Sequence, residues 1–380
     1  MIYLDNAATT WPKPPEVKES MLEALSSGGN PGRGGHLAAV QASRLIERVR
    51  EELCELFGGD DPSLVVFAQN ATHALNQALF GLLQPGDHVI TSSLEHNAVS
   101  RPLWVLAQQG VEVTEIPVVP EQEFPWETFE KAFRKNTKLV VTVHASNVTG
   151  TLLPVERIGK IARAKSVLYL LDAAQTAGVF PLDLGRLAVD LLAFPGHKGL
   201  LGPQGTGGLI IRPGISLRPL FYGGTGSLSE SDRQPDFLPD ALESGTLNSV
   251  GIAGLGAGVR YLKNQGLASI REREQALSQR LIDGLTAIPG VKLYGGTDAS
   301  KKAPIVSFNI TDIDSTIIGY ALEQTGGIIA RSGLHCAPHA HATLGTLEQG
   351  TVRFSPSHFT GEEEIDRAIA AVAEVARDML

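Results

Sequence analysis

Between residues 64 and 211, short apolar runs alternate with amphipathic segments, and this alternation limits the possible folds more than any other feature. Each apolar run has the length and composition of a buried strand, and the segments between the runs have helical spacing. Strands that alternate with helices form a mostly parallel, doubly wound sheet, because a crossover helix joins parallel neighbours. The predicted strands are 64–68, 88–92, 112–117, 139–144, 168–172, 189–194 and 209–211, and the predicted helices begin at Asn70 or cover 98–109, 126–133 and 155–164.

The pattern changes after about residue 250. Two helices are predicted there, then short strands, then a closing helix, at 250–263, 270–288, 291–294, 305–310, 328–331, 351–355 and 362–379. A chain of 380 residues can form two hydrophobic cores. We therefore predict a large α/β domain over residues 15–250 and a smaller α+β domain formed by residues 1–14 and 251–380.

Composition excludes several classes of function. The net charge of −9 is spread along the chain without a basic block, so nucleic acid is not an expected partner. No segment approaches the about 18 unbroken apolar residues that a membrane helix needs, so no membrane association is expected. The N-terminus lacks the pattern of a secretory signal, and two cysteines cannot form a disulfide framework. These features predict a cytoplasmic protein.

A lysine follows the apolar strand 189–194, after a Gly-Pro break, in the motif Gly196-His197-Lys198. Open α/β sheets bind their ligands at the carboxyl ends of their strands, where this lysine is predicted to lie. A partly desolvated lysine has a depressed pKa and can attack a carbonyl as a free amine. Lys198 is therefore a candidate for a Schiff base with pyridoxal phosphate (PLP), although a solvated surface lysine gives the same local pattern.

Four more motifs follow predicted strands in the same way: Asn70-Ala71-Thr72, Glu95-His96-Asn97, Ser146-Asn147-Val148 and Asp172-Ala173-Ala174-Gln175. Free N–H groups at the start of a helix bind phosphate, which the Thr72 hydroxyl could also contact. A carboxylate at Asp172 could keep the pyridinium nitrogen of PLP protonated. Taken singly, each motif has a structural alternative, most often a helix cap.

The C-terminal part supplies an arginine and a cysteine. Arg353 is flanked by apolar residues in a predicted strand, where a guanidinium suits either a substrate carboxylate or an internal salt bridge. Cys336 lies beside a histidine on a Gly/Pro loop, downstream of Arg331, and nearby positive charge favours a reactive thiolate. The rival interpretation is a metal site, but the crowded residues His335, Cys336, His339 and His341 match no usual zinc spacing.

With these motifs in order, the chain resembles the class V aminotransferase family of PLP enzymes, and within it the SUF-type cysteine desulfurases and the selenocysteine lyases. The resemblance implies a fold type I enzyme with a mostly parallel seven-stranded sheet. It extends nearly end to end, through the motifs above and through Tyr3-Leu4-Asp5-Asn6-Ala7-Ala8, Glu243-Ser244-Gly245-Thr246 and Arg331-Ser332-Gly333-Leu334-His335-Cys336.

The resemblance implies a role for each candidate residue. Lys198 would carry the cofactor, Asp172 would pair with its pyridinium and His96 would stack on its ring. Gln175 and Asn147 would lie around the phenolic oxygen. The phosphate would be held by Ala71, Thr72 and His197, and by Thr246 of a second subunit in a homodimer. Substrate would be bound by Ala7, Asn147, Arg331 and Arg353, and Cys336 would be the nucleophile.

One position departs from the family pattern. The family usually has Ser or Thr two residues before the histidine of the His-Lys pair, as a phosphate ligand, and this chain has Pro195. Proline offers neither a hydroxyl nor an N–H. Either the phosphate is held by fewer contacts or Thr72, His197 and Thr246 suffice, and we predict that PLP still binds.

The expected reaction is conversion of L-cysteine, or a similar small amino acid, to L-alanine with a persulfide on Cys336 that passes to a sulfur-acceptor protein. Selenocysteine lyase and transamination are alternatives within the same family. A non-catalytic sulfur-relay subunit is an alternative from another class. Pro195 is the one residue that favours it, whereas Lys198, Asp172 and Cys336 speak against it.

Overall fold

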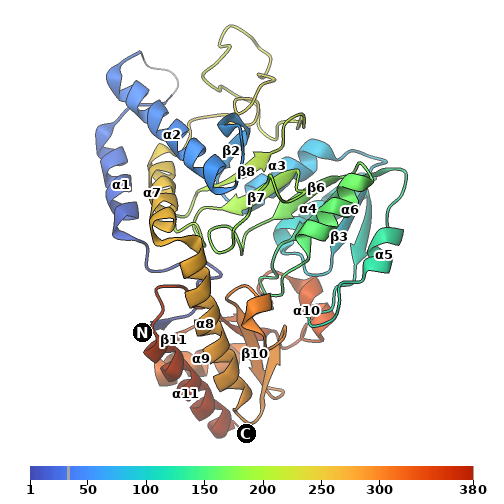
Figure 1. Cartoon of the computed structure of the whole chain (residues 1–380), viewed down its shortest axis with the longest axis vertical. Helices are drawn as coiled ribbons and strands as arrows, with labels where there is room; N and C mark the ends of the chain where they lie inside the picture. Colours follow the sequence, from blue (N-terminus) through green and yellow to red (C-terminus); the bar gives the residue numbers. More distant parts are fainter. Residues whose placement is uncertain (32–34, 380) are drawn as a thin grey trace.

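The computed structural model describes residues 1–31 and 35–379. Its larger part is built on a seven-stranded sheet with the order β2-β8-β7-β6-β5-β3-β4, and its smaller part lies below that sheet in Figure 1. The strands from β7 to β4 in this order run parallel, and β8 runs antiparallel to both β7 and β2. The strands are β2 (Val65–Ala68), β3 (His88–Ser92), β4 (Glu112–Ile116), β5 (Thr137–Val143), β6 (Leu168–Asp172), β7 (Leu191–Pro195) and β8 (Gly207–Ile211).

Helices cover both faces of this sheet because successive strand residues point to opposite sides. Leu170 and Leu191 belong to the core under α3 (Ala71–Leu82) and α4 (Asn97–Gln108). Their neighbours Leu171 and Leu192 belong to the core on the other face. That core is covered by α2 (Leu37–Leu56), α5 (Trp126–Lys131), α6 (Val155–Ala164) and α7 (Ser249–Gln265), with α1 (Pro15–Ser27) packed on α7.

The smaller part has its own sheet and core. Its antiparallel sheet has the order β12-β13-β10-β9, with β9 (Val291–Tyr294), β10 (Val306–Ile310), β12 (Arg331–Gly333) and β13 (Thr351–Phe354). Its helices are α8 (Leu267–Thr286), α9 (Ser315–Gly326), α10 (Pro338–Leu344) and α11 (Glu362–Met379). β1 (Ile2–Tyr3) pairs with β11 (Ile328–Ile329), so Ile2 and Leu4 lie in this core although they begin the chain.

The predicted fold class is confirmed, because the sheet is mostly parallel, has seven strands and accompanies a smaller α+β part. The domain bounds stay a prediction. Most of α7 lies beyond residue 250, but this helix packs on α1 and α2. The strand predicted at 328–331 is two strands, β11 and β12, in different sheets. Within the described residues, no helix combines the length and the apolar character needed to span a membrane.

Candidate active site

The parallel strands deliver polar residues to one edge of the sheet. His96 follows β3, Asn147 follows β5, Asp172 ends β6 and Lys198 follows β7. Because these strands are parallel neighbours, their carboxyl ends meet at the same edge. The sequence-predicted residues from four separate motifs are therefore brought together.

Lys198 is half-buried, and its amine has no hydrogen-bond partner in the described part of the chain. Burial, with the positive charges of Arg353 and Arg331, lowers the pKa of Lys198 to about 8, and Asp172 opposes this shift. Burial raises the pKa of Asp172, and its Oδ1 accepts the Ala174 N–H at 2.9 Å. The amine is therefore easily obtained in its neutral, nucleophilic form.

His96 caps the N-terminus of α4, where its Nδ1 accepts the Ala98 N–H at 3.0 Å. Burial lowers its pKa to about 4, and nearby Lys198 adds to this effect, so the ring is neutral at physiological pH. The next residue, Asn97, donates its backbone N–H to the Cys336 carbonyl at 2.7 Å. This bond holds the segment that contains Cys336, from the smaller part of the chain, against the N-terminus of α4.

Cys336 is exposed, and the guanidinium of Arg331 lies 3.7 Å from its sulfur. Arg353 lies within electrostatic reach of both the Lys198 amine and the Cys336 thiol. The candidate nucleophile and the candidate cofactor lysine are thus on the same side of the molecule, as their proposed roles require.

Arg353 is buried in β13 and already has partners. Its Nη2 is 2.9 Å from Asp5 Oδ1, and its Nη1 donates to the Asn147 carbonyl at 2.9 Å. The internal salt bridge that the sequence left open is therefore present. The Nε of Arg353 is buried without a partner among residues 1–31 and 35–379, so its N–H remains available to a ligand.

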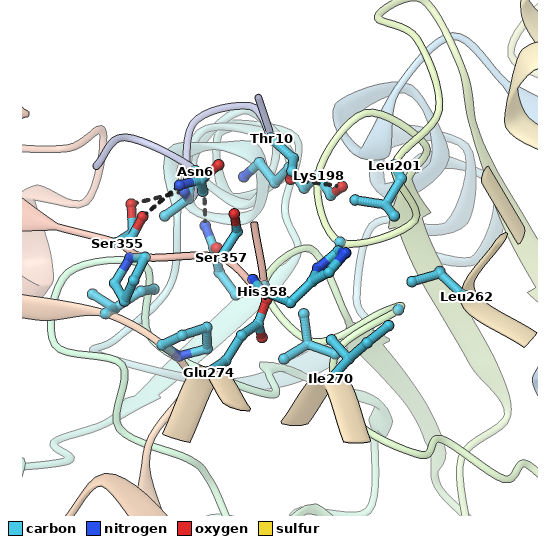
Figure 2. Close-up of a pocket in the computed structure, with 18 of the residues that line it drawn as sticks. Asn6, Thr10, Lys198, Leu201, Leu262, Ile270, Glu274, Ser355, Ser357 and His358 are labelled. Carbon is cyan, nitrogen blue, oxygen red and sulfur yellow. Dashed lines mark hydrogen bonds between the residues drawn. The ribbon is translucent and has the colours of Figure 1, made fainter. Parts of the chain in front are cut away.

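A pocket beside Lys198 lies between the two parts of the chain. It is lined by the N-terminal loop with Asn6 and Ala7, the loop after β6 with Gln175, and α8. Figure 2 shows Lys198 and Asn6 on one side of this pocket and Glu274 on the opposite side. Gln175 donates from Nε2 to the Ala7 carbonyl at 3.1 Å, and both residues line this pocket together with Lys198.

The sequence predicts a phosphate site at the start of α3. Asn70 caps this helix by accepting the His73 N–H at 2.9 Å, so Ala71 and Thr72 occupy its first turn. The Nδ1 of His197 is buried and has no partner in the described chain. Thr246, in contrast, is exposed and lines a different pocket with Gln69. The single chain therefore does not bring Thr246 to Lys198.

The histidines near Cys336 have separate partners. His335 is paired with Thr351, His339 with Glu115 and His341 with Thr346. No group of three or more His, Cys, Asp or Glu residues suited to a metal ion exists among the described residues.

Sequence reasoning missed three residues that shape the site. Asp5 forms an ion pair with Arg353, which lies near the other end of the sequence. Asn97 donates its backbone N–H to the Cys336 carbonyl. Glu95 is fully buried and accepts from Ser92 and the Val143 N–H, and burial raises its pKa to about 8. All three stand in motifs quoted from the sequence, but neither spacing nor composition identifies their partners.

Comparison with known proteins identifies the family. The family model for class V aminotransferases matches residues 2–368. The chain belongs to the class V aminotransferase family. A probable cysteine desulfurase of Methanothermobacter thermautotrophicus is 35% identical, with 99% of this chain and 94% of that protein covered. The cysteine desulfurase IscS of Serratia proteamaculans is 34% identical, with 98% and 91% covered.

Solved structures of the family share the fold. The apo structure of a cysteine desulfurase from Thermococcus onnurineus has a TM-score of 0.93 at 33% identity and covers 99% of this chain and 95% of that one. The cysteine desulfurase CsdA of Escherichia coli, in an S-sulfonic acid form, has a TM-score of 0.88 at 27% identity and covers 100% and 95%. The placement in the SUF-type group within the family stays a prediction.

The residues present fit a pyridoxal cofactor. The buried polar atoms that lack partners in the described chain include Asn147 Oδ1, His197 Nδ1 and Arg353 Nε, and also Glu274 Oε2 and His358 Nε2 in the pocket beside Lys198. Buried polar atoms are normally satisfied, so these orphans point to a polar ligand. An available amine, a buried carboxylate and a helix N-terminus are the groups that an aldehyde, a pyridinium and a phosphate require.

Proposed function

We propose that this protein is a PLP-dependent cysteine desulfurase that converts L-cysteine to L-alanine and retains the sulfur as a persulfide on Cys336. The observation that carries the proposal is the position of an exposed thiol, contacted by Arg331 and fixed beside His96, at the site that contains Lys198. The names of the relatives support the same reaction.

PLP would be held by Lys198, Asp172 and the first turn of α3, with His96, Asn147, Gln175 and His197 around it. When bound, PLP supplies an electron sink that eases removal of the substrate Cα proton. Lys198, whose pKa burial lowers to about 8, takes and returns that proton. Arg331 and the free Nε of Arg353 supply positive charge for the substrate carboxylate, near Ala7.

Cys336 then acts on the substrate sulfur. A bond forms between the two sulfurs as the substrate C–S bond breaks, and Cβ keeps the electron pair of that bond. Cβ also gains one proton, which balances the proton that Cys336 loses. The products are alanine and a Cys336 persulfide, so no external oxidant or reductant is needed. The persulfide then passes to a thiol acceptor.

Product analysis tests this proposal. Purified protein loaded with PLP is expected to form alanine from L-cysteine, and Cys336→Ser should lose this turnover while it keeps the absorbance of bound PLP. A keto acid in place of alanine would indicate transamination. Equal turnover by wild type and Cys336→Ser would contradict the nucleophile assignment, and a faster Cys336-independent reaction with selenocysteine would favour selenocysteine lyase.

We further propose that the protein is a homodimer in which Thr246 reaches the phosphate of the partner subunit. The exposure of Thr246, away from Lys198 in its own chain, supports this arrangement. The exposed aromatic residues Phe221 and Tyr222 lie in the long loop between β8 and α7, which extends from the top of the molecule in Figure 1. Two unpaired cysteines support the cytoplasmic location.

A further inference from the structure

His335 and Cys336 share an uncommon backbone conformation. Their φ angles are 49° and 58°, so two successive side-chain-bearing residues lie in the left-handed region. L-residues rarely adopt this conformation, and two in succession persist only where the surrounding structure holds them. Something must therefore hold the segment that carries the thiol.

Besides the contact of Arg331 with the Cys336 sulfur, three hydrogen bonds fasten this segment. The Cys336 carbonyl accepts the Asn97 N–H at 2.7 Å, and the His335 carbonyl accepts from Asn147 Nδ2 at 2.7 Å. Both of these partners belong to the larger part of the chain. The third bond joins His335 Nε2 to the Thr351 hydroxyl at 3.0 Å and lies within the smaller part. Of these three bonds, it alone uses a side chain of the segment; the other two use the backbone carbonyls of His335 and Cys336.

The His335 ring is turned toward the core of the protein. The residue is only 3% exposed, and its ring packs 5.6 Å from that of His341. Burial and the charges of Arg353, His341 and Arg331 lower the pKa of His335 to about 2, so the ring stays neutral. The thiol of Cys336, in contrast, is contacted by Arg331 at 3.7 Å.

We propose that His335 is a positioning residue that anchors the nucleophile through Thr351, and that it does not accept the proton of the Cys336 thiol. The inference rests on the proposed role of Cys336. Without the ring–hydroxyl bond, the two left-handed residues relax toward ordinary backbone conformations, and the thiol leaves its place beside Arg331 and the substrate.

The test uses holoenzyme and a matched pair of variants at Thr351. Thr351→Val removes the hydroxyl at constant shape, whereas Thr351→Ser keeps it. We expect Thr351→Val to lower kcat for alanine formation about tenfold, as for loss of one buried hydrogen bond, with KM and the PLP absorbance nearly unchanged. Thr351→Ser should restore most of the wild-type kcat. Equal kcat values for wild type and Thr351→Val would overturn the proposal.

Alkylation of the thiol by iodoacetamide provides a readout that does not depend on turnover. Cys54 is buried, so the label reports on Cys336. We expect Thr351→Val and His335→Gln to change the alkylation rate at fixed pH but not the pH midpoint of alkylation. An upward shift of that midpoint in His335→Gln would identify a general base and reject the positioning role. If wild type forms no alanine, the proposed function fails, and the alkylation profile still decides the role of His335.

Discussion

A half-buried lysine near two arginines and two carboxylates has a free amine at a lower pH than a surface lysine when desolvation and the arginines dominate. At Lys198 the cost of desolvation and the repulsion from Arg353 outweigh the attraction of Asp172, so the pKa falls from 10.5 to about 8. The protonated amine cannot attack an aldehyde, whereas the neutral amine can. Cofactor uptake should therefore follow the titration of Lys198.

We expect the rate of PLP incorporation into the apo-protein to rise with pH through a midpoint near pH 8 and to level off about one unit above that midpoint. Stopped-flow absorbance of bound PLP measures this rate, and a free lysine derivative measured over the same range corrects for the titration of PLP itself. Lys198→Arg should form no covalent complex. A rate that still rises steeply above pH 9.5, about 1.5 units past the expected midpoint, would contradict the lowered pKa.

The sequence predicted that Lys198, Asp172, His96 and Asn147 would meet at one edge of the sheet, because each lies at the end of an apolar strand or just after it and parallel strands end at one edge. It could not show that Arg353 pairs with Asp5, because that contact joins β13 to a segment at the other end of the chain. It also could not orient Asn147, whose amide donates to the His335 carbonyl.

At the scale of elements, the loop after β6 touches the loop that carries Lys198. Gly178 has a φ of 82°, and a Cβ there would lie 2.3 Å from the Gly199 carbonyl oxygen. Gly214 has a similar φ of 85° but has no heavy atom within 4 Å of such a Cβ. Replacement of either glycine by alanine therefore carries the same backbone penalty, but only at Gly178 would the new Cβ also clash with a neighbouring atom.

Gly178→Ala should therefore be less stable than Gly214→Ala by about 1–3 kcal/mol, because overpacking adds to the shared backbone cost. Urea unfolding of both variants measures the difference. Displacement of Gly199 should also lower PLP occupancy in Gly178→Ala alone. Equal stability and equal occupancy of the two variants would show that the loops are not tightly coupled.

A buried ion pair ties α2 to the segment that carries Thr246. Arg50 is 1% exposed and binds both carboxylate oxygens of Glu243, at 2.8 and 3.0 Å, and Glu243 also accepts the Phe67 N–H at 2.6 Å. Loss of one partner leaves the other charge buried and unpaired.

Arg50→Met should lower the free energy of unfolding by about 3–5 kcal/mol. The double variant Arg50→Met/Glu243→Gln should recover part of this loss, because it leaves no unpaired charge. Denaturant titration of the two single variants and the double variant gives the coupling. A loss below about 1 kcal/mol in Arg50→Met would mean that the pair behaves as an exposed one.

Among the elements, long helices and buried strands were predictable, whereas α9 and α10 were missed. α9 begins after Asp314, whose side chain accepts the Thr316 N–H, but its buried residues are few and its periodicity is weak. α10 spans only seven residues, and the Gly/Pro loop that the sequence predicted over 331–338 shares Pro338 with it. β1 and β11 have two residues each and exist because residues from opposite ends of the chain meet.

At the scale of the whole molecule, the proposed dimer would build each site from two subunits. Lys198 and Thr246 of one chain would then serve different sites. The Lys198→Ala homodimer should be inactive and the Thr246→Val homodimer weakened. When the two variants are mixed, activity should return, because one of the two sites in a mixed dimer contains both native residues.

Mixed subunits should reach about half of the wild-type activity per heterodimer, and light scattering should report a dimer throughout. Activity that stays at the average of the two parent variants would place Thr246 at the site of its own chain. A monomeric wild-type protein would contradict the shared site altogether.

The most direct test of the central claim is the mass of the protein after a single turnover with L-cysteine. The account predicts that the peptide containing Cys336 gains one sulfur atom for each alanine released, while the peptide containing Cys54 gains none. Alanine release without added sulfur on the Cys336 peptide would contradict it.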